Sequence, residues 1–91
     1  MAKVDIYTKA YCPYCTRAMA LLEHKLADHP SLHIDEIDIG CDMTLREKMI
    51  ERSGGGYTVP QIFIDGVHVG GCDQLVALEM NKQLDAMLAA N

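Results

Sequence analysis

The chain has 91 residues and a formal net charge of −5, from 8 Lys and Arg against 13 Asp and Glu. Hydrophobic residues make up 49% of it, which suffices for the core of one small domain and argues against intrinsic disorder. The acidic balance excludes nucleic acid and anionic membranes as expected partners, because both require clustered Lys and Arg. We therefore expect a single domain over residues 1–91.

The sequence also predicts where the protein works. Its longest apolar runs are shorter than the roughly 18 residues that a membrane-spanning helix needs. The first residues, Met1 to Asp5, lack the apolar core of a signal peptide. These features predict a cytoplasmic protein. In a reducing cytosol, a closely spaced cysteine pair is more often catalytic or metal-binding than a structural disulfide.

A strand, a loop and a helix are predicted at the start of the chain. Apolar residues alternate over residues 4–7, which is typical of a half-buried strand. The following loop leads to a helix rich in Met and Leu. Pro13 suits the first position of that helix, since the missing N–H would have no partner there. The helix must end before Pro30, so Cys12 is expected at its N-terminus.

The middle of the chain predicts a second strand and a second helix. The strand covers residues 33–39, where isoleucines alternate with acidic residues. The helix starts near Asp42, and Thr44 and Glu47 have the spacing of a capping box. The glycine run over residues 54–56 ends it.

A hairpin and a last helical region complete the predicted order β-α-β-α-β-β-α. Strands over residues 59–64 and 67–69 flank Asp65-Gly66, a dipeptide typical of a two-residue hairpin turn. Asp73 is expected to cap the last helical region, which is predicted to be interrupted near Asn81.

Two of the four cysteines are closely spaced, Cys12 and Cys15, whereas Cys41 and Cys72 stand alone. The doubled Cys-x-x-Cys spacing of a structural zinc site is therefore absent. A helix N-terminus favours a thiolate, which is the nucleophile in disulfide exchange. We expect Cys12 to attack and Cys15, one turn further along the helix, to resolve. A chance pair, or half of a metal site completed by Cys41, Cys72 or a histidine, is the alternative.

Three motifs extend this interpretation: Lys9-Ala10-Tyr11-Cys12-Pro13-Tyr14-Cys15, then Thr58-Val59-Pro60, then Gly70-Gly71-Cys72-Asp73. In this order and at these separations, the chain resembles a dithiol glutaredoxin of the small bacterial type over essentially its whole length. The resemblance implies an α/β protein with a thioredoxin-like fold, in which helices flank a four-stranded mixed sheet. It also implies glutathione as the reducing co-substrate, with no bound cofactor and no metal.

The resemblance further implies a glutathione site. A cis peptide bond before Pro60 is expected to turn the Val59 backbone toward the cysteinyl unit of glutathione. The N–H groups near Cys72 would bind the γ-glutamyl carboxylate, and Asp73 its ammonium group. Lys9 would face the glycyl carboxylate and the Cys12 thiolate. The predicted glutathione-binding residues are Lys9, Tyr14, Thr58, Val59, Pro60, Gly71, Cys72 and Asp73.

Several of these residues also have simpler interpretations. Pro60 could be an ordinary edge-strand proline, Asp73 a plain N-cap, Lys9 a solvated surface lysine and Tyr14 an exposed aromatic residue. Cys72 is expected to contribute its backbone, with a third thiol open to glutathionylation as the alternative. Cys41 is expected to be a small, partly exposed residue without a role, and the four histidines show no metal-ligand spacing.

The chain departs from the family pattern at two positions. Many members carry Arg or Lys just before Thr-Val-Pro, whereas Tyr57 and three glycines precede Thr58 here. Arg52 is a candidate substitute for that missing cation. A further acid often follows the position of Asp73, and here it is Gln74.

We therefore predict a glutathione-dependent thiol–disulfide oxidoreductase that serves as an electron donor in cell redox homeostasis. It reduces protein–glutathione mixed disulfides through Cys12, and protein disulfides through Cys12 and Cys15. Its expected partners are glutathione and client proteins that are glutathionylated or contain disulfides, and a monomer is expected. One alternative is a redoxin reduced by thioredoxin reductase. Another is a two-subunit iron–sulfur carrier, which Pro13 disfavours because such glutaredoxins usually have Gly or Ser there.

Overall fold

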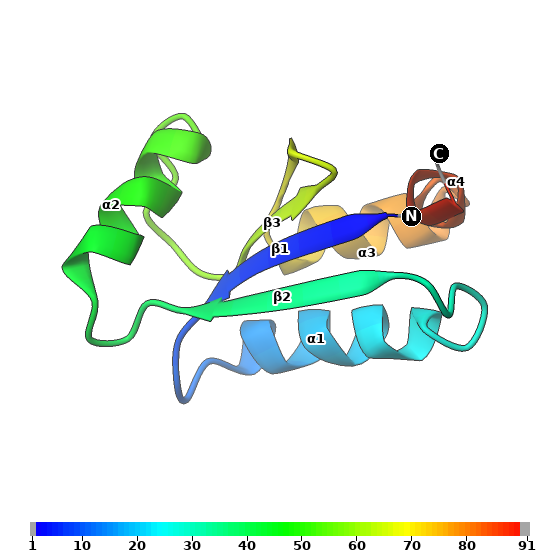
Figure 1. Cartoon of the computed structure of the whole chain (residues 1–91), viewed down its shortest axis with the longest axis horizontal. Coiled ribbons are helices and arrows are strands. Elements are labelled where there is room, and N and C mark those ends of the chain that lie inside the picture. The colour runs from blue at the N-terminus through cyan, green and yellow to red at the C-terminus, as the bar shows by residue number, and fades with distance from the viewer. Residues whose placement is uncertain (1, 90–91) are drawn as a thin grey trace.

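Four strands form one mixed sheet with helices on both of its faces (Figure 1). The computed structural model describes residues 2–89. The strand order is β2-β1-β3-β4, with β1 and β2 parallel and the other two pairs antiparallel. The elements are β1 (Lys3–Thr8), α1 (Pro13–Lys25), β2 (His33–Asp38), α2 (Met43–Arg52), β3 (Gln61–Ile64), β4 (Val67–Gly70), α3 (Cys72–Met80) and α4 (Leu84–Ala89).

The alternation in β1 separates two hydrophobic cores. Val4 and Ile6 face the larger core, together with residues of β3, α1, α3 and α4 such as Leu22 and Leu75. Tyr7 points the other way and packs with residues of α2 and β3. The two-residue period of the strand therefore places α1 and α3 on one face of the sheet and α2 on the opposite face.

Helix α1 begins as predicted. Cys12 has an extended backbone and caps the helix, and Pro13 occupies its first turn. The N–H groups of residues 26–29 donate to the carbonyl groups of the last turn, and the helix ends before Pro30. The cysteine pair thus lies at the N-terminal end of α1.

The predicted capping box of α2 is wrong. Asp42 caps this helix, because its side chain accepts a hydrogen bond of 3.0 Å from the N–H of Leu45. Helix α2 starts at Met43, so Thr44 lies inside the helix and is not its N-cap residue.

The predicted cap of α3 is also wrong. Gly71 is the N-cap residue, and Asp73 lies inside the first turn. The Gln74 side chain closes the end instead, since its Oε1 accepts the Gly71 N–H at 2.8 Å. The carboxylate of Asp73 is therefore not engaged in capping.

The remaining turns follow the predicted chemistry. Asp65 and Gly66 both have positive φ angles, 50° and 83°, as the tight β3–β4 turn requires. The peptide bond between Val59 and Pro60 is cis, as expected, and β3 begins only at Gln61 rather than at Val59. The last helical region is interrupted after Met80, also as predicted.

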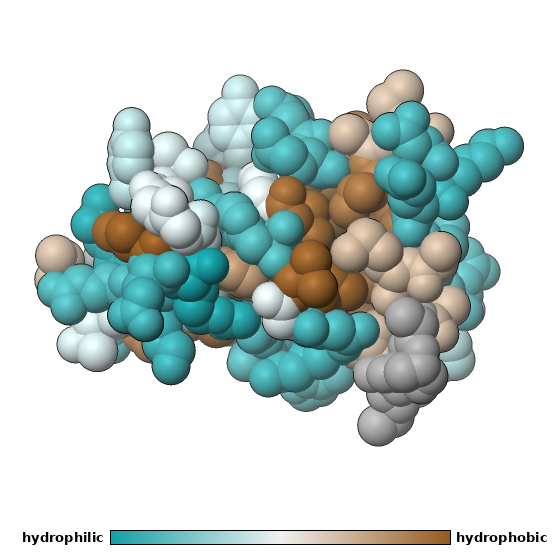
Figure 2. Space-filling view, turned by 90° about the horizontal axis from the view of Figure 1, so that it is seen from above, coloured by the Kyte–Doolittle hydropathy of each residue, from teal (hydrophilic) through white to brown (hydrophobic). Residues whose placement is uncertain are grey.

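A buried lysine with two carboxylate partners holds the C-terminal helices against α1. The Lys25 side chain is only 6% exposed, and its Nζ lies 2.7 Å from Glu79 Oε1 and 3.1 Å from Asp85 Oδ2. On the face seen from above, apolar residues reach the surface near the middle, bordered by hydrophilic residues (Figure 2). Within residues 2–89, no helix is long and apolar enough to cross a membrane.

Candidate active site

The two cysteines of the pair lie in unlike surroundings. Cys12 is half-buried, and its Sγ accepts a hydrogen bond from the backbone N–H of Cys15 at 3.2 Å. The same sulfur lies 3.9 Å from the carbonyl oxygen of Val59. Cys12 Sγ therefore lies at the start of α1, within reach of a backbone N–H donor and of the segment before Pro60.

Cys15 is buried beneath Cys12. Only 4% of Cys15 is exposed. Its burial and its hydrogen bond to Cys12 raise the pKa of the Cys15 thiol to about 12, and the charges of Cys12 and Glu36 add to the shift. At neutral pH Cys15 is therefore a protonated thiol.

The predicted glutathione residues come together in one cleft of about 320 Å³. The Thr58–Val59–Pro60 segment forms one wall, and the start of α3 forms another. Three segments that are distant in the sequence meet there. Except for Lys9, all the predicted glutathione residues line this cleft, which is formed by Tyr14, Thr58, Val59, Pro60, Gly71, Cys72, Asp73 and Gln74.

Lys9 lies in a neighbouring cavity of about 460 Å³ that shares Thr58 and Val59 with the first cleft. Arg46 of α2 lines the same cavity, as does the exposed ring of Tyr57. The sequence pattern did not single out Arg46, because it lies twelve positions before Thr58 on another element. No local signal could have found it, since only the packing of α2 brings it to this edge.

The suggestion that Arg52 replaces the missing cation is wrong. The Arg52 guanidinium is held by Asp5 of β1, with Nη2 and Oδ2 3.1 Å apart. It also donates to the Tyr7 hydroxyl at 2.9 Å and lies 4.1 Å from the centre of the Phe63 ring. These contacts keep it within the core around α2.

The other two cysteines differ in accessibility. Cys72 is buried at the start of α3, and burial raises the pKa of its thiol while the positive charge of Arg17 opposes the shift. Cys41 is exposed in the turn before α2. Among residues 2–89, no three His, Cys, Asp or Glu side chains are grouped so that they could hold a metal ion.

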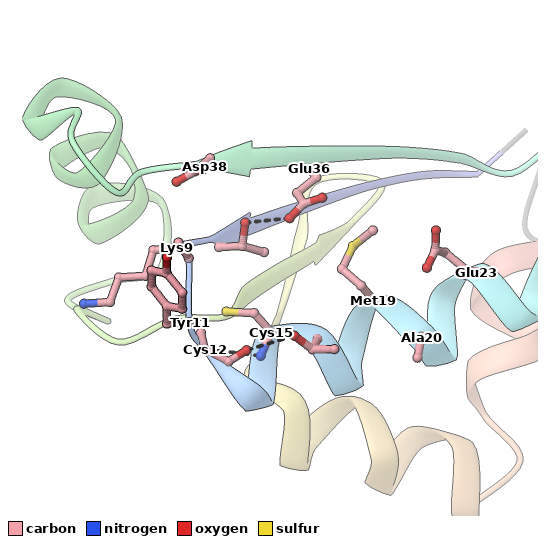
Figure 3. A pocket seen from close by; sticks show the side chains of 12 residues that line it. Lys9, Tyr11, Cys12, Cys15, Met19, Ala20, Glu23, Glu36 and Asp38 are labelled. Atoms are coloured by element: carbon pink, nitrogen blue, oxygen red, sulfur yellow. Dashed lines mark hydrogen bonds between the residues drawn. The ribbon is translucent and has the colours of Figure 1, made fainter.

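A second cleft adjoins the cysteine pair. Its volume is about 430 Å³, and both Cys12 and Cys15 line it. Figure 3 shows Met19 rising from α1 toward β2, with Glu23 and Glu36 beside it. Glu36 is held by a hydrogen bond of 2.9 Å from the Thr8 hydroxyl. This cleft shares no lining residue with the cleft around Pro60 and Asp73.

Comparison with known proteins gives a consistent result. The glutaredoxin family model matches residues 4–69. Glutaredoxin 3 of Escherichia coli is 51% identical over 88 residues, which cover 97% of this chain and 99% of that protein.

Solved structures agree in fold. The dithiolic glutaredoxin 2-C-Grx1 of Trypanosoma brucei brucei superposes with a TM-score of 0.80 at 31% identity, covering 94% of this chain and 86% of that one. A buckwheat glutaredoxin–glutathione complex gives 0.78 at 26% identity, covering 93% and 74%. The fold is therefore the predicted thioredoxin fold, and the chain belongs to the glutaredoxin family of glutathione-dependent thiol–disulfide oxidoreductases.

Proposed function

We propose that this protein uses glutathione to reduce protein–glutathione mixed disulfides through Cys12, and protein disulfides through Cys12 and Cys15. One observation carries the proposal: the Cys12 sulfur accepts the Cys15 N–H at 3.2 Å and lies 3.9 Å from the Val59 carbonyl, at the edge of the cleft predicted for glutathione. A nucleophile and a tripeptide-sized cleft thus adjoin one another.

The first reaction needs only Cys12. Its thiolate attacks the glutathione sulfur of a mixed disulfide, forms a Cys12–glutathione disulfide and releases the client as a thiol. A second glutathione thiolate then attacks that glutathione sulfur, giving oxidised glutathione and the Cys12 thiolate. The Cys15 N–H stabilises the Cys12 sulfur whenever it carries charge, as nucleophile and as leaving group.

The second reaction also uses Cys15. Cys12 attacks a client disulfide and forms a mixed disulfide, and the Cys15 sulfur then attacks Cys12 Sγ. The client leaves fully reduced, and two glutathione molecules reduce the Cys12–Cys15 disulfide. Once Cys12 is covalently capped, its charge and its hydrogen bond no longer raise the pKa of Cys15. Cys15 therefore becomes a better nucleophile at the step that needs it.

The cleft suggests how glutathione is oriented. Its cysteinyl unit would pair with the backbone of Val59, next to Cys12. Its γ-glutamyl end would meet the N-terminus of α3 and the carboxylate of Asp73, which capping leaves available. Its glycyl carboxylate would extend toward Lys9 and Arg46 in the adjoining cavity. The two carboxylates and the ammonium group of glutathione would each face an opposite charge or N–H groups.

The expected partners of this protein are client proteins that are glutathionylated or contain disulfides. The protein is expected to act on them as a monomer in the cytoplasm. Glutaredoxins have reduction potentials of roughly −200 to −230 mV, which the cytosolic glutathione pool can support. The proposal includes no bound cofactor. Sedimentation of the reduced protein tests the monomer, since a sedimenting dimer would contradict it.

The test is glutathione-coupled reduction of a small mixed disulfide and of a disulfide-bonded client protein. Cys12→Ser should abolish both activities. Cys15→Ser should keep the first and lose the second, and Cys41→Ser is the matched control that should keep both. Replacing glutathione and its reductase with thioredoxin reductase separates the alternative donor. Loss of the first activity in Cys15→Ser, or turnover by thioredoxin reductase alone, would overturn the proposal.

A further inference from the structure

A continuous groove leads away from the cysteine pair between α1 and β2. The cleft of about 430 Å³ that contains Cys12 and Cys15 shares Met19, Glu23 and Glu36 with a second cavity of about 330 Å³. Two cavities that share three lining residues form one elongated depression. It starts at the nucleophile and follows the helix.

We propose that this groove binds an extended segment of the client protein, next to the client's reacting cysteine, and that it selects segments with basic residues near that cysteine. The inference rests on the proposed function and adds to it which client segments the protein recognises. The groove shares no lining residue with the cleft around Val59 and Asp73, and it shares only Lys9 with the cavity proposed for the glycyl end of glutathione. Glutathione and client therefore have separate places beside Cys12, which meet at Lys9.

The length of the groove fits a peptide. Along α1, the distance from Cys12 to Leu26 is about 20 Å at 1.5 Å per helical residue, which equals about six residues of an extended chain. Leu26 is exposed and lines the far cavity. A segment of this length can therefore begin at the Cys12 sulfur and reach the far end of the groove.

The charges of the groove indicate which segment it accepts. Glu23, Glu36 and Asp38 line it and are all exposed. Lys9 also borders the near cavity, but its side chain is directed away from Met19 and Glu23 (Figure 3). His33 is the other basic side chain, at the far end. The groove next to the cysteines therefore has negative charge that complements Lys or Arg.

The floor and the far end of the groove are apolar. Met19 lies in the floor where the two cavities meet, and Leu26 and Ile34 line the far cavity. An unbranched, flexible thioether adapts to different side chains. The preferred client segment therefore has a basic residue near its cysteine and an apolar residue further along.

Two glutathionylated peptides test the preference. One has the sequence Leu-Arg-Arg-Gly-Cys-Gly-Arg-Arg-Leu, which presents the same side chains in either chain direction, and the other has Glu in place of each Arg. The wild type should reduce the first with the higher kcat/KM. The double variant Glu23→Gln, Glu36→Gln should lower the ratio of the two kcat/KM values about fivefold, as expected for two exposed charge pairs.

A matched control distinguishes the effect of the charges in the groove from the effect of the overall charge of −5. The double variant Glu47→Gln, Glu51→Gln removes the same charge from exposed positions of α2. It should leave the ratio close to that of the wild type. Equal ratios for both double variants, or a wild type without preference, would overturn the inference.

A binding measurement is independent of the redox reaction. Peptides with Ser in place of Cys are titrated into the ¹⁵N-labelled protein. The arginine peptide should shift the amide signals of Met19, Glu23 and Ile34, and the glutamate peptide should not. Shifts confined to other surfaces would overturn the inference. If the proposed function failed, neither peptide nor a small mixed disulfide would be reduced. The titration would still show whether the groove binds the arginine peptide.

Discussion

The backbone N–H of Cys15 donates a hydrogen bond to Cys12 Sγ at 3.2 Å, so the main chain of one cysteine contacts the sulfur of the other. Its own side chain is buried and remains protonated. A single turn of helix therefore places the two sulfurs of the pair in different surroundings. In the proposed reaction, the attacking Cys12 sulfur has a hydrogen-bond donor, and Cys15 stays a thiol until the resolving step.

The first prediction concerns pH and stability. The pKa of Cys15 is about 12 in the folded protein, against an ordinary value of 9.0. Below pH 9 Cys15 is protonated in both the folded and the unfolded protein, so its raised pKa contributes fully to stability. Above pH 9 the unfolded chain loses the proton first, and the free energy of unfolding falls as pH rises toward the folded pKa. The loss is at most about 1.4 kcal/mol per pH unit.

Urea denaturation of the reduced protein between pH 8 and 10.5 measures this slope. Other groups also titrate there, so Cys15→Ser is the matched comparison that retains them. The wild type should lose stability with pH more steeply than the variant. Parallel slopes for the two proteins would contradict the raised pKa.

The second prediction separates two arginines of α2. Arg46 borders the cavity beside Thr58 and Lys9, so Arg46→Gln should raise the KM for glutathione about threefold with little change in stability. Arg52 bonds Asp5 and the Tyr7 hydroxyl, so Arg52→Gln should lower the free energy of unfolding by about 2 kcal/mol. Steady-state kinetics and denaturation of both variants check this. The opposite pattern would mean that the cation is supplied by Arg52.

The third prediction tests the γ-glutamyl end of the cleft. Asp73 lines the cleft and is exposed in the first turn of α3, so Asp73→Asn should raise the KM for glutathione about threefold. A glutathione analogue that lacks the γ-glutamyl ammonium group should show no difference between wild type and variant. Asp28→Asn, a change at an exposed turn residue, is the control. An equal effect on the analogue would exclude a direct Asp73–ammonium pair.

The fourth prediction concerns the attachment of the last two helices. Lys25 lies buried between Glu79 and Asp85, and the hydrogen bond that its Nζ donates to Glu79 contributes most to raising its pKa. Lys25→Met removes the cation shared by Glu79 and Asp85. In the described part of the chain only Asp85 keeps another partner, His29 at 2.9 Å, so the free energy of unfolding should fall by about 2 kcal/mol. Lys48→Met at an exposed position of α2 should change it by less than about 0.5 kcal/mol. Thermal denaturation of both variants would show whether the contacts of Lys25 with Glu79 and Asp85 stabilise the fold.

Short-range features of the fold were predictable because neighbouring residues decide them. Alternation around Val4 and Ile6 gave β1, Pro13 placed the start of α1, and Asp65-Gly66 gave the hairpin turn. Cap residues were less predictable. Several polar residues near a helix start compete for the same N–H groups, so Asp42 was preferred to Thr44, and Gln74 rather than Asp73 closed the end at Gly71.

By itself, the sequence determined the cysteine pair, its place at a helix N-terminus and the motifs around Pro60 and Asp73, since these depend on spacing along the chain. Only the tertiary structure decided that Arg46 reaches the site while Arg52 is held by Asp5, and that Glu23 and Glu36 face one groove. The physical reason is that side chains from separate elements meet through packing, and spacing in sequence does not specify which face of a helix is packed against which strand.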